Sequence, residues 1–261
     1  MIEEILLLSG NDIPFPQASV TIHQPTLKEI AYIGEEAFFV GCGFLDFSKD
    51  LLNFEDKSRL KDYDDFDIFM SIVINNKKDV RRSIESAFLV LDLIFPLYKV
   101  SVRDKLIILT KDNEEHSINK NNFSDFRKII SAMFNLNIGG SQFETYNPKG
   151  DMAARIAEKF KQRHKKLNEL ASQNGTGSSN KISILSRYIS ILAVGLQKDL
   201  NSLMHYTIYQ LYDEFQRFQL KVQWDAYVQA RMAGAKDLEE VDNWMINLQD
   251  QGKNKNKNKI N

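Results

Sequence analysis

Apolar residues recur every three or four positions through much of this 261-residue chain, which is the spacing of amphipathic helices. The first such run begins at Thr26, which stands three residues before Glu29 as in a capping box, and it continues to Phe44. Gly34 and two later glycines weaken its last turns. The same spacing predicts three further helices in the first half: 65–75, 79–95 with Asp79 as its candidate cap, and one that starts at Asn122 or Ser124 and ends before Asn137.

Extended segments are predicted at two places in the first half. Residues 5–8 and 19–22 are expected to be extended, because Pro14 and Pro16 between them are incompatible with a helix. Further on, three runs rich in β-branched residues are separated by short turns, which predicts a small antiparallel β-meander or hairpin. Its strands are expected at 97–102, 105–110 and 115–118. The chain is therefore predicted to be mostly α, of the α+β type.

The composition changes in the second half and divides the chain. An α+β N-terminal domain is expected over 1–149, followed by a basic amphipathic helix over 150–171. The Gly/Ser/Asn-rich stretch 172–180 is predicted to be a flexible linker, and 181–250 a helical C-terminal module. The Lys/Asn-rich end, 251–261, is expected to be disordered. The basic helix is interpreted as a solvated face or a surface for an acidic helix rather than a nucleic-acid contact.

The C-terminal module carries the best candidate for a binding surface. Its long helix has apolar positions alternately four and three residues apart, like a coiled-coil seam: Met204, Ile208, Leu211, Phe215, Phe218, Val222 and Ala226. Gly234 is expected to close this helix as its C′ glycine. An aromatic flank beside the seam and a short helix after Gly234 supply the candidate partner-binding residues: Tyr209, Tyr212, Trp224, Tyr227, Trp244 and Met245. Such faces suit helix-in-groove recognition, although core packing is the commoner role of any single aromatic.

Composition and charge narrow the classes of function. Hydrophobic residues make up 43% of the chain, which supports a sizeable core. The 34 basic and 35 acidic residues nearly cancel, so nucleic acid is an unlikely general partner. The acidic N-terminus does not make a signal peptide, and the longest apolar stretch, 87–97, is too short to span a membrane. We expect a soluble protein of a reducing cytoplasm, in which the single cysteine, Cys42, is a buried free thiol.

Residue patterns that carry catalysis or metal binding are not found. The four histidines stand singly, without the spacing of metal ligands. The acidic segment 46–67 lacks the glycine and terminal glutamate of a calcium loop, and is expected to be a solvated face that leads into a helix N-terminus. Neither a phosphate-binding glycine loop nor a nucleophile motif occurs. We therefore predict no enzymatic activity, no metal and no cofactor.

Two parts of the sequence resemble proteins of tailed bacteriophages. In the C-terminal third, residues 184–192 read ILSRYISIL and residues 207–215 read TIYQLYDEF; QARMAGA at 229–235, an acidic spacer and Trp244 follow. Near the N-terminus, residues 22–30 read IHQPTLKEI. Over about residues 20–40 and 182–248 the chain is similar to the tail assembly chaperones that are encoded beside the tape-measure gene.

This resemblance implies a non-catalytic factor that binds the tape-measure protein, the tail-tube protein or both during tail assembly in the host cytoplasm. The first alternative is a structural component of the virion tail or neck. The second is a nucleic-acid-binding or regulatory phage protein. Self-association is left open.

Overall fold

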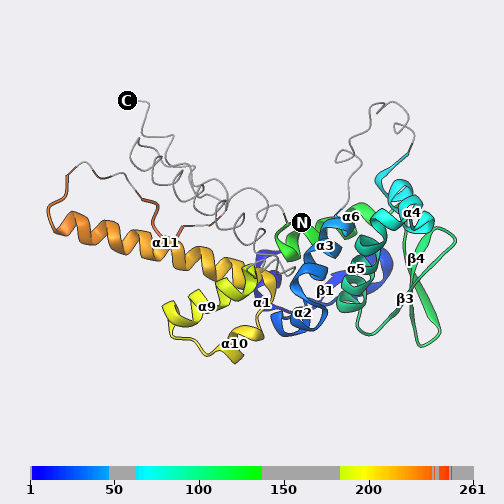
Figure 1. Ribbon diagram of the computed structural model, residues 1–261, viewed down its shortest axis with the longest axis horizontal. Coiled ribbons are helices and arrows are strands. Elements are labelled where there is room, and N and C mark those ends of the chain that lie inside the picture. The colour runs from blue at the N-terminus through cyan, green and yellow to red at the C-terminus, as the bar shows by residue number, and fades with distance from the viewer. Residues whose placement is uncertain are drawn as a thin grey trace, which may run out of the picture.

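The computed structural model describes residues 2–46, 63–136 and 183–236, together with 238, 241–246 and 248. Helices dominate these ranges, and two small antiparallel sheets complete them. The predicted α+β class, mostly α with an antiparallel meander, is confirmed. The predicted basic helix, the linker and the Lys/Asn-rich end lie outside the described residues. Figure 1 shows the meander at one end of the molecule and the long helix α11 extending toward the other.

The N-terminal segment forms a helix where an extended segment was predicted. Residues 5–8 lie in α1 (Glu4–Ser9), so that prediction is wrong. Glu4 in the first turn suits the helix dipole, and Gly10 ends the helix in the left-handed region at φ 71°. Four apolar residues in a row are compatible with a strand or a helix, because so short a run shows no periodicity that distinguishes the two. Strands β1 (Ile13–Phe15) and β2 (Val20–Ile22) then pair antiparallel, with Ile13 opposite Ile22.

The long helix predicted from Thr26 is two helices, α2 (Leu27–Ile33) and α3 (Glu35–Leu45). The capping box of Thr26 and Glu29 is confirmed. Gly34 separates the helices because it adopts φ 88°, a conformation that side chains disfavour. The sequence spacing continued across this glycine because both helices pack on the same core.

Helices α4 (Asp65–Asn75) and α5 (Lys78–Ile94) confirm the two predicted helices, although Asp79 lies in the first turn of α5 rather than at its cap. Helices α3 and α5 approach closely at Gly41. A Cβ atom there would stand 2.3 Å from the backbone oxygen of Ser86, so glycine is needed for this crossing. Cys42, the next residue, is fully buried, and burial raises the pKa of its thiol.

The predicted meander is confirmed as β3 (Lys99–Arg103), β4 (Leu106–Lys111) and β5 (Glu114–Ile118). Both connections are two-residue turns, Asp104–Lys105 and Asp112–Asn113, in which every φ is positive. Such turns match the twist of antiparallel strands. Helix α6 (Phe123–Phe134) follows and covers the core with one apolar face.

The described ends of the acidic segment anchor it to α6. Asp64 accepts a hydrogen bond from the backbone N–H of Asp67 and so caps α4, as expected for acids at a helix N-terminus. Arg127 of α6 donates to Asp65 at 2.6 Å and lies 3.7 Å from the carboxylate of Asp46. Residues 47–62 are outside the described ranges.

The C-terminal part consists of α9 (Ile184–Leu196), α10 (Leu200–Met204) and α11 (Ile208–Met232). Gly234 closes α11 as predicted. Its N–H donates to the carbonyl of Arg231, and the next N–H, of Ala235, donates to Ala230, which is a Schellman motif. The short helix expected around Trp244 and Met245 is a turn instead, and Met204, expected on the long helix, belongs to α10.

One continuous group of buried side chains connects both parts of the chain. It includes Phe15 and Phe126 from the N-terminal part and Leu192 and Leu211 from the C-terminal helices. The boundary between a 1–149 domain and a 181–250 module therefore stays a prediction about sequence organisation, while the described residues share one core.

Candidate partner-binding surface

The start of α11 is tied to the start of α2 through two adjacent capping boxes. Thr26 caps α2 and Thr207 caps α11, and the two threonines form an isolated antiparallel bridge. The N–H of Leu27 donates to the carbonyl of Tyr206 at 2.8 Å. Gln210 completes its own capping box and also donates from Nε2 to the carbonyl of Leu8 at 2.7 Å. The C-terminal helices are thus hydrogen-bonded to the N-terminal part at helix starts, where backbone donors would otherwise lack partners.

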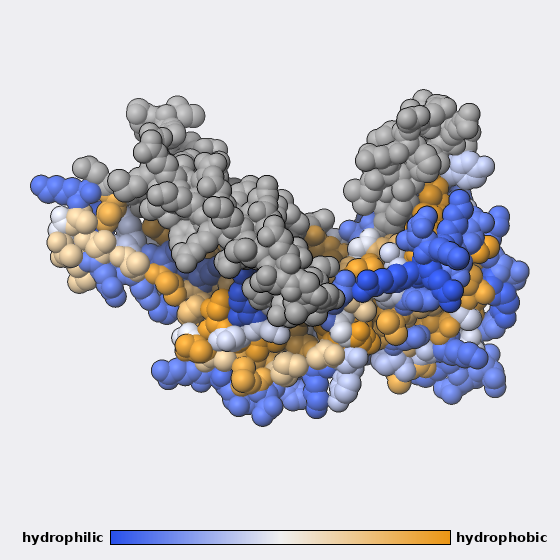
Figure 2. Space-filling model, in the orientation of Figure 1, coloured by the Kyte–Doolittle hydropathy of each residue, from blue (hydrophilic) through white to orange (hydrophobic). Residues whose placement is uncertain are grey.

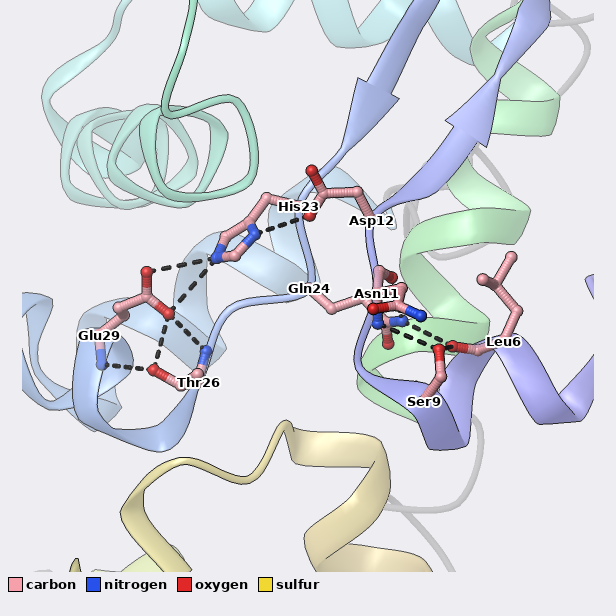
Figure 3. Close-up of polar contacts among 8 residues, drawn as sticks. All are labelled: Leu6, Ser9, Asn11, Asp12, His23, Gln24, Thr26 and Glu29. Carbon is pink, nitrogen blue, oxygen red and sulfur yellow. Dashed lines mark hydrogen bonds and ion pairs between the residues drawn. The ribbon is translucent and has the colours of Figure 1, made fainter. Parts of the chain in front are cut away.

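On the N-terminal side of this junction, His23 lies between two carboxylates (Figure 3). Its Nδ1 lies 2.9 Å from Asp12 Oδ1, and its Nε2 lies 3.3 Å from Glu29 Oε1. Burial raises the pKa of Glu29, but hydrogen bonds from Thr26 and the charge of His23 outweigh burial and leave that pKa below its usual value. The capping carboxylate is therefore held in its charged form.

Gln24 holds the N-terminal turn against the same junction. Its side chain is almost fully buried, and its Nε2 donates to the carbonyls of Leu6 and Asn11, at 2.9 and 2.6 Å (Figure 3). These two bonds connect the segment just before the α2 cap to helix α1 and to the residues that precede β1. They therefore help to hold the Thr26 capping box in place.

Helix α9 begins on a carboxylate supplied by α3. Glu35 Oε1 accepts hydrogen bonds from the backbone N–H groups of Ile184 and Leu185, at 2.8 and 3.1 Å. Ser183 caps the next free donor, on Ser186. A carboxylate at a helix N-terminus also interacts favourably with the helix dipole. The N-terminal part therefore determines where α9 starts.

Helices α9 and α11 run in the same direction along their contact. Tyr188 early in α9 stacks on Phe215, with ring centroids 4.1 Å apart. Near the end of α9, a Cβ atom on Gly195 would stand 2.3 Å from the ring of Phe218. Because α9 ends one residue later, at Leu196, its contact with the α11 seam ends near Phe218.

Beyond that point the α11 seam is exposed. Ile208, Leu211 and Phe215 are buried, whereas Val222, on the same stripe, is 50% exposed. The aromatic flank behaves differently in this half, because Trp224 and Tyr227 are half-buried and their rings lie 5.9 Å apart. Figure 1 shows this half of α11 reaching past α9.

A second exposed apolar stripe runs along α9, and we call it the α9 stripe: Ile184, Ile191 and Val194. These residues are seven and three positions apart, so they share one face, and Val194 is 80% exposed. Leu200 at the start of α10 is exposed as well. Figure 2 shows hydrophobic colour over the α9–α10 region. Adjacent exposed apolar side chains are typical of protein-binding surfaces.

The structure distributes the predicted partner-binding residues over different environments. Tyr212 is 6% exposed and packs beside Tyr188, so it belongs to the core. Tyr209 is half-buried, and burial together with the nearby Glu4 carboxylate raises its pKa to about 12. Met245 is 70% exposed. Trp244 is half-buried beside α11, away from the Trp224–Tyr227 pair. The aromatic flank is therefore not one continuous surface.

A groove of about 450 Å³ lies beside α11 where Trp244 approaches it. Its apolar walls come from Leu8, Leu196, Phe218 and Trp244. Its charged side consists of residues that α11 presents at helical spacing: Asp213, Glu214, Arg217 and Lys221. Both the groove and the α9 stripe were missed from the sequence. The seven- and three-residue spacing could have revealed the stripe, but α9 is so apolar that it suggests a helix buried on all sides.

Neither a cluster of metal-binding side chains nor a membrane-spanning helix is found among the described residues. No group of three or more His, Cys, Asp and Glu side chains there could hold a metal ion. Within those same ranges, no helix is both long and apolar enough to cross a bilayer.

Comparison with known proteins finds one similarity, and it covers the C-terminal helices. Residues 178–249 match the family described as the YomV second domain, and YomV is a phage-encoded protein. The matched segment contains α9, α10, α11 and Trp244, and coincides with the larger of the two parts that resemble phage proteins in sequence. Neither a curated protein nor a solved structure matches the chain. The family match supports a phage origin for the protein.

Proposed function

We propose that this protein is a non-catalytic, tail-assembly-chaperone-like protein of a phage, which binds an amphipathic segment of the tape-measure protein, the tail-tube protein or both. The observation that carries the proposal is the α9 stripe, because it is exposed, apolar and part of the segment that is similar to a phage domain. A chaperone of this kind needs an apolar surface to cover the apolar face of a client until assembly.

Burial of the α9 stripe by a client helix would be favourable. Covering an exposed Val, Leu or Ile side chain stabilises a complex by up to roughly 1.5–3 kcal/mol before the costs of association are subtracted. Three such residues with Leu200 support a weak, reversible complex rather than a permanent one. Reversibility suits a chaperone, which must release its client when the tail tube forms.

Co-expression with the product of the neighbouring tape-measure gene tests this proposal. We expect the wild-type protein to keep that product in the soluble fraction, and the double variant Ile191→Ser/Val194→Ser to lose this effect. Ile74→Ser is the matched control, since Ile74 is a 52% exposed isoleucine of helix α4, outside the proposed surface. Equal insolubility of the client with and without the wild-type protein would reject the proposal.

Two measurements separate the alternatives. A chaperone should be missing from purified virions, whereas a structural tail or neck component should be found there by mass spectrometry. A nucleic-acid-binding regulator should bind random DNA with an affinity that falls steeply with salt. We expect neither virion retention nor such binding.

A further inference from the structure

One face of the second half of α11 is exposed over about three turns. Its residues follow one another at helical spacing, and all of them are exposed: Gln219, Val222, Gln223, Ala226 and Gln229. Val222 lies seven positions after Phe215, so this face continues the one that α9 covers in the first half of the helix. We call it the distal α11 face.

The distal α11 face carries no charged residue. The charged residues of α11 all lie on its other sides: Asp213, Glu214, Arg217, Lys221, Asp225 and Arg231. Four of them form ion pairs within the helix, between Asp213 and Arg217 and between Lys221 and Asp225. A helix face that meets only water normally carries charges. A partner with a charged surface would find no counter-charge on this one, so the face favours an uncharged partner surface.

The distal α11 face is complementary to itself. A side-chain amide both donates and accepts hydrogen bonds, so one glutamine can pair with another. If a second copy of the helix runs antiparallel about a two-fold axis level with residue 224, Gln219 lies opposite Gln229 of the second copy. Val222 then lies opposite the small side chain of Ala226 of the second copy, and symmetry makes each pair occur twice.

This register also gives the contact the anatomy of a protein interface. Both copies of Val222, the largest apolar side chain of the face, come next to the axis, where water is excluded. The two glutamine pairs lie at the ends, so an apolar centre is flanked by a polar rim. No second kind of surface is needed to satisfy either part.

We propose that two copies of the chain associate through the distal α11 face, with the two helices antiparallel. The face is only about 16 Å long, so the contact is smaller than the ~1,000 Å² that stable interfaces exceed, and the dimer is a weak one. The pairing requires no client and therefore does not rest on the proposed function.

Analytical ultracentrifugation of the full-length protein at rising concentration tests the pairing. We expect a monomer–dimer equilibrium with a Kd on the order of 10–1,000 µM. Val222→Glu should weaken it at least about tenfold, because it places two like charges beside the axis. Val194→Glu is the matched control, since Val194 is an exposed helical valine of α9 outside this face, and it should leave the equilibrium unchanged. Circular dichroism checks that both variants are folded.

Two results of this experiment would overturn the proposal. One is a protein that stays monomeric up to about 1 mM. The other is a dimer that Val194→Glu weakens as much as Val222→Glu does, since the contact would then not be specific to the distal α11 face.

Cross-linking tests the direction of the helices. The variants Gln219→Cys and Gln229→Cys are each oxidised mildly alone and as a mixture, and mass spectrometry identifies the linked peptides. We expect disulfide-linked dimers mainly from the mixture, because only there do the two engineered thiols face each other within disulfide reach. Wild type is the control, since its single cysteine, Cys42, is buried. Cross-linking of each variant alone as efficiently as in the mixture would reject the antiparallel arrangement.

Discussion

The two halves of α11 carry the same apolar stripe in different surroundings. In the first half, Ile208, Leu211 and Phe215 are buried against α9 and the N-terminal part. In the second half, the stripe continues to Val222, which is half exposed. Leu220, two residues earlier on another face, is buried. The face that is covered therefore changes along one helix, although the spacing of apolar residues does not.

This difference shows what a periodic pattern can and cannot predict. The spacing determines which residues share a face, because it follows from the helix itself. The cover over that face depends on where the neighbouring helix ends. Helix α9 ends close to Phe218, because Gln197 adopts the left-handed conformation directly after Leu196. The exposed half of the stripe is thus a product of helix length rather than of composition.

The largest expected effect compares truncations in the two halves. Leu211→Ala removes a fully buried side chain and should lower the free energy of unfolding by about 2–5 kcal/mol. Val222→Ala, on the same stripe, should lower it by less than about 1 kcal/mol, because that side chain is half exposed. Urea unfolding followed by circular dichroism measures both. Similar losses for the two variants would mean that the second half is covered as firmly as the first.

The next effect concerns the crossing of α9 and α11. Gly195→Ala places a Cβ atom against the ring of Phe218 and should destabilise the protein by about 1–3 kcal/mol, reduced by the better helix propensity of alanine. Gly43→Ala in α3 is the control, since its Cβ would meet nothing within 4 Å, and it should stabilise the protein by roughly 0.5–1 kcal/mol. Thermal unfolding of both variants gives the signs. Stabilisation by both alanines would show that Phe218 moves aside freely and that the crossing is loose.

A smaller effect is expected where α9 begins. Glu35→Ala removes the carboxylate that accepts from the first two N–H groups of the helix, which should cost about 1 kcal/mol. It should also raise hydrogen exchange at the start of α9. Glu36→Ala removes an acid that pairs with Arg82 at an exposed position and should change stability by less. If the exchange rates in α9 do not change in Glu35→Ala, the N-terminal part does not fix the position of α9.

The smallest effect is a pH dependence at the junction that holds the first half of α11. The folded-state pKa of Glu29 lies below its usual value of 4.5, so the carboxylate stabilises the fold above that pH. This contribution is lost as the pH falls through the lowered folded-state value. The difference in unfolding free energy between wild type and Glu29→Gln should therefore be greatest near neutral pH and shrink below about pH 4.5. Glu85→Gln, at an exposed pair with Arg81, should show little difference at either pH.

Local signals in the sequence predicted much of the fold. The capping box at Thr26, the two turns of the meander and the closing glycine Gly234 each depend on residues a few positions apart, and each is confirmed. Errors arose where distant packing decides. Residues 5–8 form a helix that is held by Gln210, about two hundred positions away, and the segment around Trp244 is a turn against α11.

The candidate surface was less predictable than the fold. Residue type alone does not determine whether an aromatic or apolar side chain is exposed. Tyr212 is buried beside Tyr188, whereas Met245 is exposed. The α9 stripe could not be predicted from spacing alone, because the exposure of its residues depends on the tertiary structure. The groove could not have been predicted, since Leu8 and Trp244 meet only in the folded protein.

The burial of Cys42 makes its rate of chemical modification a measure of how often the core opens. The chain has a single thiol, and the core around α3 both shields it and disfavours the reactive thiolate. A thiol-specific reagent can then modify the protein only during excursions that open the core. The rate of modification, followed by mass spectrometry without any engineered label, would report how often the core opens and whether a bound client makes such openings rarer.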